Sequence, residues 1–405
     1  MKKIYFLMAA LFMAATVSAH GTDSKTEAMT KASDAEKGVL FRSKNDKFTL
    51  KAGGHIDMRV AYDFNGISHD LDFIPTTING EGNQELRMDA TTSYFWFNGE
   101  MDGGVFGPVK FVVDFDFRNG KTSSYTPRLR FLYINFKGLT MGRNVTTFCD
   151  LGAAPMTIDF QQPNSYTFHF ATMIRYNLYL LDKKLDLCVA AELPSVPDTN
   201  VETYSTIEQR VPDFPFYAQY NFGKNYKNHI RVLGLLRDIY YKNNVTRNNT
   251  SLLGWGVGAS GHFQFCKPFE LFFNGQYGQG ISTYMMDLNM PNMDINTVTN
   301  RDEHDRLETR KMWGWQVGAH FNLRKNLYLS TGYSEVGLDN CGQYSAQTPQ
   351  FGANFRRAQY AFGGAFWQFT KHCQFSMEYL YGSRENMDGV KNEANRIQAR
   401  MRFSF

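Results

Sequence analysis

The segment Arg396-Ile-Gln-Ala-Arg-Met-Arg-Phe-Ser-Phe405 decides how this sequence folds. Polar and apolar residues alternate in it without a break, and a period of two is typical of an extended strand with two different faces. One face is rich in arginine, whereas the other is apolar and ends in two phenylalanines. In a chain with an export signal, this contrast favours strands that meet lipid on one face and a wet lumen on the other. We therefore expect an all-β protein that forms a transmembrane antiparallel β-barrel.

The first residues have the pattern of a secretory signal peptide. Lys2 and Lys3 precede an apolar core from Ile4 to Ala15, and the small residues Val17-Ser18-Ala19 form a cleavage site. We expect residues 1–19 to be the signal, cleaved after Ala19. Residues 20–47 are polar, and we expect a disordered periplasmic leader. Residues 48–405 are then the barrel, and the expected location is the bacterial outer membrane.

Composition excludes several other classes of protein. No later apolar run approaches the roughly 18–20 residues of a membrane-spanning helix. Phe, Tyr and Trp make up 15% of the chain, as a lipid-facing surface and its interfacial girdles require. The net charge of +4 includes no basic tract, so we expect no nucleic-acid partner. The five cysteines show no metal-ligand spacing, and we expect neither a metal nor a cofactor.

The links between strand-like segments alternate between short and long. Short links such as Lys137-Gly138 and Arg324-Lys325-Asn326 are followed by long ones such as 144–167 and 337–354. Outer-membrane barrels have short periplasmic turns and long external loops. When the strands are counted back from a periplasmic C-terminus, every short link falls on the same side. The count predicts a barrel of about sixteen strands, a size that leaves a channel.

The third long link, residues 144–167, is unusually apolar for a loop in solvent. A loop of this composition is expected to pack against something. We expect it to fold into the lumen and narrow it, with two carboxylates projecting into the channel, although an ordinary packed surface loop remains the alternative. The candidate constriction residues are Phe148, Asp150, Pro155, Asp159 and Gln162.

Arginines dominate the lumen side when faces are assigned by alternation. Guanidinium groups offer fixed positive charge and bidentate docking for carboxylate or phosphate, although part of the set could instead form salt bridges within the wall. Arg143 belongs to the other face by alternation, with Leu139 and Met141. It is still included among the candidates, because it lies at a strand end next to the third loop, where alternation is a weak guide to the face. The candidate pore-lining residues are Arg59, Arg87, Arg128, Arg130, Arg143, Arg175, Arg396, Arg400 and Arg402, with Arg118 and Arg231 on the same face.

Enzymatic patterns are absent from the sequence. No histidine lies in an HExxH arrangement or beside a serine in a nucleophile elbow. We expect a channel rather than an enzyme, and a diffusion porin with preference for small anionic solutes. A surface-binding adhesin barrel and an outer-membrane barrel enzyme remain the alternatives.

Several motifs resemble those of the DcaP-like porins. They are Arg128-Leu-Arg-Phe-Leu-Tyr133, Met141-Gly-Arg143, Phe148-Cys-Asp150, Pro155-Met-Thr-Ile-Asp-Phe160, Gln162-Pro-Asn164 and Ile174-Arg175-Tyr176. They cover the first third of the barrel, and beyond Leu180 the resemblance rests on strand rhythm. The phosphate-selective porin O/P family is the nearest alternative, but lysines are expected to dominate there. Unlike some members of the DcaP-like group, this chain shows no heptads between His20 and Lys47.

The resemblance implies a homotrimer of sixteen-stranded channels that pass small anionic solutes such as dicarboxylates. It also implies pore roles for Arg128, Arg130, Arg143, Asp150, Asp159 and Arg175. The other expected partners are outer-membrane lipid, lipopolysaccharide, and the barrel-assembly machinery. The last of these would read the terminal aromatic, Phe405, as it reads the C-terminal signature of bacterial outer-membrane proteins.

Overall fold

The computed structural model describes residues 38–65, 67, 71–120, 124–198, 204–224, 227–291, 293–299, 305–339 and 355–405. Nearly all regular structure in these residues is β-strand, and no helix among them is long and apolar enough to cross a membrane. The predicted signal peptide and most of the predicted leader lie outside the described residues. The strands are β1 (Val39–Arg42), β2 (Phe48–Asp63), β3 (Glu85–Asp89), β4 (Tyr94–Asp102), β5 (Pro108–Asp116), β6 (Arg128–Phe136), β7 (Leu139–Val145), β8 (Phe170–Leu180), β9 (Leu185–Glu192), β10 (Tyr204–Thr206), β11 (Phe214–Phe222), β12 (Asn228–Asn243), β13 (Asn249–Cys266), β14 (Phe269–Gln279), β15 (Ile295–Thr299), β16 (Asp305–Thr309), β17 (Lys311–Arg324), β18 (Leu327–Leu338), β19 (Phe355–Gln368), β20 (Cys373–Asn386) and β21 (Lys391–Ser404).

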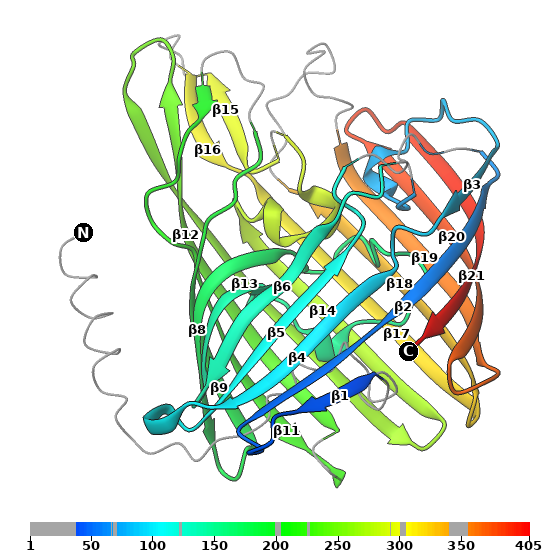
Figure 1. Ribbon diagram of the computed structural model, residues 1–405. Coiled ribbons are helices and arrows are strands. Elements are labelled where there is room, and N and C mark those ends of the chain that lie inside the picture. Colours follow the sequence, from blue (N-terminus) through cyan, green and yellow to red (C-terminus); the bar gives the residue numbers. More distant parts are fainter. Residues whose placement is uncertain are drawn as a thin grey trace.

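Sixteen of these strands form a closed antiparallel barrel in the described part of the chain (Figure 1). The wall runs in order through β2, β4–β9, β11–β14 and β17–β21, and β21 pairs with β2 to close it. The barrel and the strand number therefore confirm the sequence prediction. The remaining strands are accessory: β3 extends the line of β4, whereas β10, β15 and β16 belong to long links.

Strand alternation decides which side chains face inward. On β21, Arg396, Gln398 and Arg400 are buried inside, whereas Ile397 and Met401 are exposed outside. On nearly every strand, the outward face of the wall carries large apolar residues whose exposed fractions are similar to those of Ile397 and Met401. A surface in contact with hydrocarbon requires such residues.

Short turns join the strands at one end of the barrel, and their backbone matches their sequence. Lys137 and Gly138 link β6 to β7, and both have positive φ, 47° and 83°. Two consecutive residues of this kind form the turn whose twist suits a hairpin, and glycine takes the second position without a steric cost.

One part of the predicted leader is ordered, which corrects the expectation for residues 38–47. Val39–Arg42 forms β1 and pairs with β2 from Thr49 to Ala52. Strand β2 extends beyond the point where β21 ends, so its edge there is free. β1 satisfies that edge with hydrogen bonds.

The core lies inside the barrel, where three long links fold back into the lumen. They come from residues 71–78, 146–167 and 280–291, and they contain the short 3-10 helices η2 (Pro75–Thr77), η4 (Leu151–Ala153), η6 (Ser282–Tyr284) and η7 (Met286–Leu288). Their apolar side chains join two clusters with inward residues of the wall, one around Phe148, Tyr284 and Leu288, the other around Phe73 and Tyr360.

Candidate functional site

The third long link, residues 146–167, is fixed at its base to the barrel wall. We call it the inner loop. The carboxylate of Glu192, on β9, accepts the Thr146 hydroxyl at 2.7 Å and the Thr147 amide at 2.6 Å. Phe148 follows and is completely buried. The chain is therefore turned into the lumen as soon as it leaves β7.

Asp150 makes the next attachment, to β12 and β13. Its carboxylate accepts hydrogen bonds from His229 at 2.8 Å, from the Ser260 hydroxyl at 2.6 Å and from the Gly152 amide at 3.0 Å. Burial alone would raise the pKa of Asp150, but the charge of Arg231 and the hydrogen bond from His229 outweigh it and hold this pKa well below its usual range. The carboxylate stays ionised as an anchor.

The far end of the inner loop is clamped to the opposite wall by Glu378, on β20. This carboxylate accepts two consecutive backbone amides, Ile158 at 3.0 Å and Asp159 at 3.1 Å, and is itself oriented by the Gln398 amide at 2.8 Å. Because the acceptor is buried, these bonds lie in a low local dielectric and are stronger than the same bonds in water. The inner loop therefore crosses the lumen from β7 to β20.

Further bonds hold the inner loop along β17, β18 and β19. The Met156 amide donates to Nε2 of His320 at 3.1 Å, and the Ser165 amide donates to the Ser334 hydroxyl at 3.2 Å. The side-chain amide of Asn164 donates to the carbonyl of Ala358 at 3.0 Å. This series of bonds leaves the loop backbone little freedom on that side of the barrel.

The other two inward links cover the inner loop. The Phe73 amide donates to Asp159 at 3.4 Å, and the Met286 amide donates to the carbonyl of Tyr166 at 2.9 Å. Thr76 and Asp287 connect the two links to each other through the Thr76 hydroxyl. The sequence analysis did not predict that either link folds inward. Their buried apolar residues, such as Phe73, were the signal that could have shown it.

The part of the wall from β21 through β2, β4 and β5 to β6 presents guanidinium groups to the lumen. Arg128, on β6, pairs with Asp116, and Arg402, on β21, makes a bidentate pair with Asp57 at 2.7 Å for both bonds. In both pairs the arginine side chain keeps about a quarter of its surface exposed, 26% and 24%, whereas the carboxylates are 0% and 1% exposed. The carboxylates lie behind the guanidinium groups, so this region presents positive charge to the lumen. We call the region that carries Arg118, Arg128 and Arg402 the arginine wall.

Phe160 of the inner loop faces these arginines. Its ring centroid lies 4.2 Å from the guanidinium carbon of Arg118 and 5.3 Å from that of Arg128. Arg118 also pairs with Asp72, at 2.5 Å. An aromatic face fixes the plane of a guanidinium without neutralising its charge. The tip of the inner loop and the arginine wall thus meet at one level of the barrel.

Three other predicted arginines form ion pairs with inward carboxylates, and two of them, Arg59 and Arg396, are fully buried. Arg396 and Arg87 share the carboxylate of Asp63, at 2.6 and 2.9 Å, and Arg59 lies 3.3 Å from Asp89. The guanidinium of Arg130 lies farther from its acids, 3.7 Å from Asp114. Arg59 and Arg396 therefore act within the wall, as the salt-bridge alternative supposes.

Arg175, Arg400 and Arg143 have no carboxylate at ion-pair distance among the described residues. Arg175 and Arg400 are buried on the inward face, and Arg400 donates to Gln374 at 3.0 Å. Arg143 pairs in register with the exposed Leu132, so it lies on the outward face of β7. Its Nε donates to the carbonyl of Leu129 at 3.1 Å.

The predicted constriction residues all lie in the inner loop, but the two acids do not project into water. Asp150 and Asp159 are 0% and 1% exposed, because each carboxylate is occupied by partners of the wall or the neighbouring link. The expectation that they face the channel is corrected accordingly. Pro155 is buried, whereas Gln162 is partly exposed and has a positive φ of 66°.

Comparison with known proteins places this architecture in a family. The family model of the DcaP outer membrane protein matches residues 22–405. The chain belongs to the DcaP family of outer-membrane proteins. This DcaP-family channel is thus an outer-membrane protein of the porin type, as the sequence resemblance indicated. No curated protein matches the chain.

Solved structures share the fold. The outer membrane channel DcaP of Acinetobacter baumannii is 20% identical, with a TM-score of 0.77 over 90% of this chain and 99% of that one. OmpT of Vibrio cholerae is 12% identical, with a TM-score of 0.56 over 90% and 99% of the two chains. OmpF of Salmonella typhi is 13% identical, with a TM-score of 0.56 over 90% and 100%.

Proposed function

We propose that this DcaP-family channel lets small hydrophilic solutes diffuse across the outer membrane and prefers anions. The observation that carries the proposal is the layering of charge on the arginine wall. Arg128 and Arg402 are partly exposed to the lumen, whereas their partners Asp116 and Asp57 are buried behind them. A solute that passes this wall meets guanidinium groups first.

The chemistry of the arginine wall suits carboxylates and phosphates. The guanidinium fork matches the two oxygens of a carboxylate, and its charge is permanent. Arg118 follows the end of β5, Arg128 lies on the adjacent β6, and Phe160 narrows the space in front of both. Arg402 lies on β21, on the other side of β2 and β4. Charges in a narrow lumen act within the Debye length, about 8 Å at physiological salt. We infer that dicarboxylates and phosphate-like ions are the solutes favoured.

We propose in addition that three copies assemble around the face that carries Arg143. An outward arginine near the bilayer midplane costs roughly 2–4 kcal/mol when it faces lipid. Among the residues that the structure describes, Arg143 contacts the carbonyl of Leu129 and the ring of Phe170, 5.4 Å away, and no carboxylate lies at ion-pair distance. A neighbouring protomer that covers this residue removes the cost. OmpT of Vibrio cholerae, 12% identical with a TM-score of 0.55, occurs in a trimer form.

A hydrolytic function finds no support at the buried Ser260, Asp150 and His229. The hydroxyl of Ser260 and the imidazole of His229 both bind the carboxylate of Asp150, so the imidazole is occupied by the acid and not by the serine. A serine nucleophile needs the reverse order, with the histidine between.

Reversal potentials in planar bilayers test the anion preference. The double variant Arg128→Gln with Arg402→Gln should shift the reversal potential towards cations at low salt, and the shift should fade as ionic strength rises. Arg356→Gln is the matched control, because Arg356 is an exposed arginine paired with Glu385 at the end of β20. If the double variant and the control have equal reversal potentials, the arginine wall does not set selectivity.

A further inference from the structure

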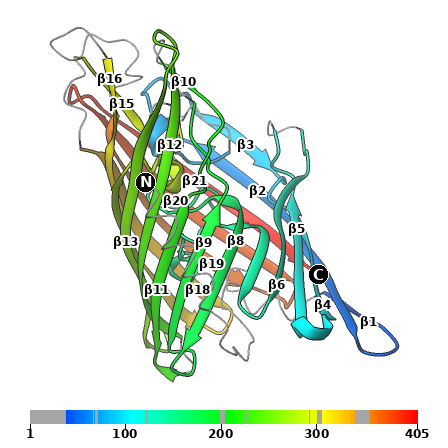
Figure 2. The ribbon, with the colours of Figure 1, turned by 90° about the vertical axis from the view of Figure 1, so that its left-hand side faces the viewer.

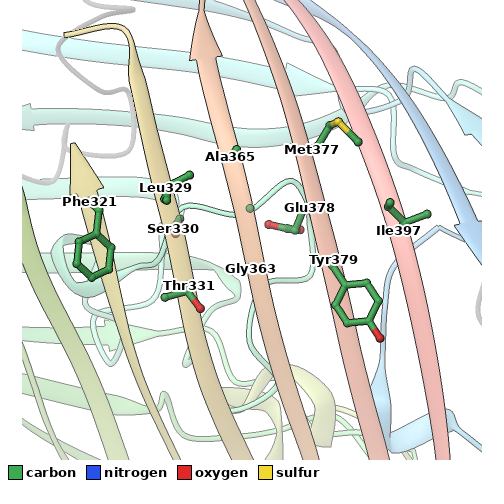
Figure 3. A pocket seen from close by; sticks show the side chains of 11 residues that line it. Phe321, Leu329, Ser330, Thr331, Gly363, Ala365, Met377, Glu378, Tyr379 and Ile397 are labelled. Atoms are coloured by element: carbon green, nitrogen blue, oxygen red, sulfur yellow. The ribbon is translucent and has the colours of Figure 1, made fainter. Parts of the chain in front are cut away.

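The outer face of the barrel carries an apolar groove where β17 to β21 pass side by side (Figure 3). We call it the outer groove; its volume is about 490 Å³. Phe321, Leu329 and Thr331 line one side, and Met377, Tyr379 and Ile397 line the other. Its floor is the backbone of β19 from Gly363 to Ala365. The side chain of Glu378 turns away from it into the lumen, where it clamps the inner loop.

The outer groove exists because β19 lacks side-chain bulk at its floor. A Cβ added to Gly363 would meet nothing closer than the hydroxyl of Thr331, at 3.9 Å. Backbone geometry and crowding therefore do not require glycine at this position. The neighbouring outward residues Leu329 on β18 and Met377 and Tyr379 on β20 are large. They project beyond the backbone of β19 at Gly363 and form the two sides of the groove. A groove of this shape loses packing contacts unless something fills it.

The groove lies in the periplasmic half of the wall. Gly363 is closer to Gln368, where β19 reaches a short turn, than to Phe355 at the external end. Trp367 and Phe369 follow it towards that turn and are 49% and 39% exposed. Exposed aromatic residues next to the turns are typical of the interfacial girdle. The groove therefore opens just above the periplasmic girdle, at the depth of the inner-leaflet acyl chains.

We propose that the outer groove binds an acyl chain of an inner-leaflet phospholipid. The lining that faces outward is apolar apart from the hydroxyls of Thr331 and Tyr379, and these are already bonded, Thr331 to the carbonyl of Phe362 at 2.9 Å and Tyr379 to Asn395 at 2.5 Å. Between a groove and lipid there is no hydrophobic driving force, so the preference for one ordered chain comes from close packing. The depth selects a phospholipid and not lipopolysaccharide, which belongs to the outer leaflet.

A second copy of the protein is a poorer occupant for this groove. The outward Arg143, which lipid covers badly, lies on β7. Strands β20, β21, β2, β4, β5 and β6 lie between β7 and β19 along the shorter way round the barrel. A protomer contact that covers Arg143 leaves the outer groove on the other side of the barrel, facing lipid. This step rests on the proposed trimer, and the oligomeric state is therefore measured in the test.

Native mass spectrometry of the full-length protein, delipidated and then titrated with phosphatidylethanolamine, tests the proposal. Wild-type protein should retain phosphatidylethanolamine, and Gly363→Trp should lower its occupancy at least fivefold by filling the groove. Gly363→Ala, which the open space accommodates, should lower it partially. Ala361→Trp is the matched control, since Ala361 shares the outward face of β19 but does not line the groove. Heat-modified migration on gels verifies that each variant is folded.

Three results would overturn the proposal. Equal retention by the wild type and Gly363→Trp would show that lipid binds elsewhere or nowhere. Preferential retention of lipopolysaccharide that only Gly363→Trp abolishes would place the ligand in the wrong leaflet. Loss of the oligomer in Gly363→Trp but not in Ala361→Trp would show that a second copy fills the groove. The last result leaves the anion channel intact as a separate proposal, because reversal potentials report on the lumen alone.

Discussion

Two regions of the wall use the same alternation of strands in different ways, and we call them the docked side and the arginine side. On β17, β18 and β20 the inward residues that bind the inner loop are polar, such as His320, Ser334 and Glu378, and they are covered by its backbone. On β6 and β21 the inward Arg128 and Arg402 keep part of their surface in the lumen. Strand alternation thus decides only that a polar residue faces inward. Whether that wall becomes a dry docking surface or a charged lining depends on the length and donor character of its side chains.

The largest effect on the difference between the two sides is expected when Glu378, which clamps the inner loop, is removed. Glu378→Ala leaves the buried amides of Ile158 and Asp159 without their acceptor, at a cost of about 3 kcal/mol to the docked loop. We expect a clear rise in single-channel conductance, measured in planar bilayers. Glu385→Ala is the control on the same strand, because Glu385 pairs with exposed arginines near the end of β20. Unchanged conductance in folded Glu378→Ala protein would mean that the remaining anchors suffice.

A lower pH should stabilise the docked arrangement of the inner loop. Burial, with the nearby charge of Asp72, raises the pKa of Asp159 to about 6 from its usual 3.8. The ionised carboxylate therefore opposes docking above pH 6, and protonation removes the penalty as the pH falls through that value. Between pH 7.5 and pH 5 the docked arrangement gains about 1.4 kcal/mol.

The expected result is lower conductance, or longer closed times, at pH 5 than at pH 7.5. Asp159→Asn should remove most of this difference, because an amide keeps the hydrogen bond from Tyr360 but does not titrate. A variant with the full pH response of the parent would assign the response to other groups.

On the arginine side, removal of the buried carboxylate of Asp116 should increase the preference for anions. Asp116→Asn leaves the guanidinium of Arg128 without its negative partner. The anion-to-cation permeability ratio should increase roughly twofold to threefold at low salt, since one unit charge is no longer balanced within a few ångströms. The reversal potential in a salt gradient measures it. A shift in the cation direction would show that Asp116 does not oppose the selectivity of this wall.

The smallest effect is expected at the point where the two sides meet. Phe160→Ala removes the ring that orients Arg118 and Arg128, a contact worth about 0.5–1 kcal/mol. Conductance should rise slightly while anion preference is retained, because the charges stay in place. Phe160→Tyr serves as the conservative control. Loss of anion preference in the alanine variant would mean that the ring itself is part of the filter.

The sequence predicted the wall much better than it predicted the lumen. Barrel closure, strand number and inward face follow from alternation and link lengths, which are local properties of residues such as Arg396 to Phe405. The inward folding of residues 71–78 and 280–291 depends on contacts between distant parts of the chain, such as Thr76 with Asp287. Asp150 and Asp159 were assigned to the correct loop. Their burial depends on hydrogen bonds with His229 and Tyr360, which are distant in the sequence, and no local pattern reveals such contacts. The pore roles of Arg128 and Arg402 remain predictions that the variants above test.

The seam between β2 and β21 has a consequence for how the protein is made. It pairs His55 with Ser404 and Asp63 with Arg396, and backbone bonds of 3.0 Å join Gly54 and Phe405 in both directions. Closing a loop of this length costs about 5 kcal/mol in chain entropy, a modest amount beside the cost of unpaired edges in hydrocarbon. A chain with this seam open has two exposed edges, and no smaller barrel satisfies them both. Assembly is therefore all or none, and a variant that weakens the seam should yield unassembled chains rather than narrower channels.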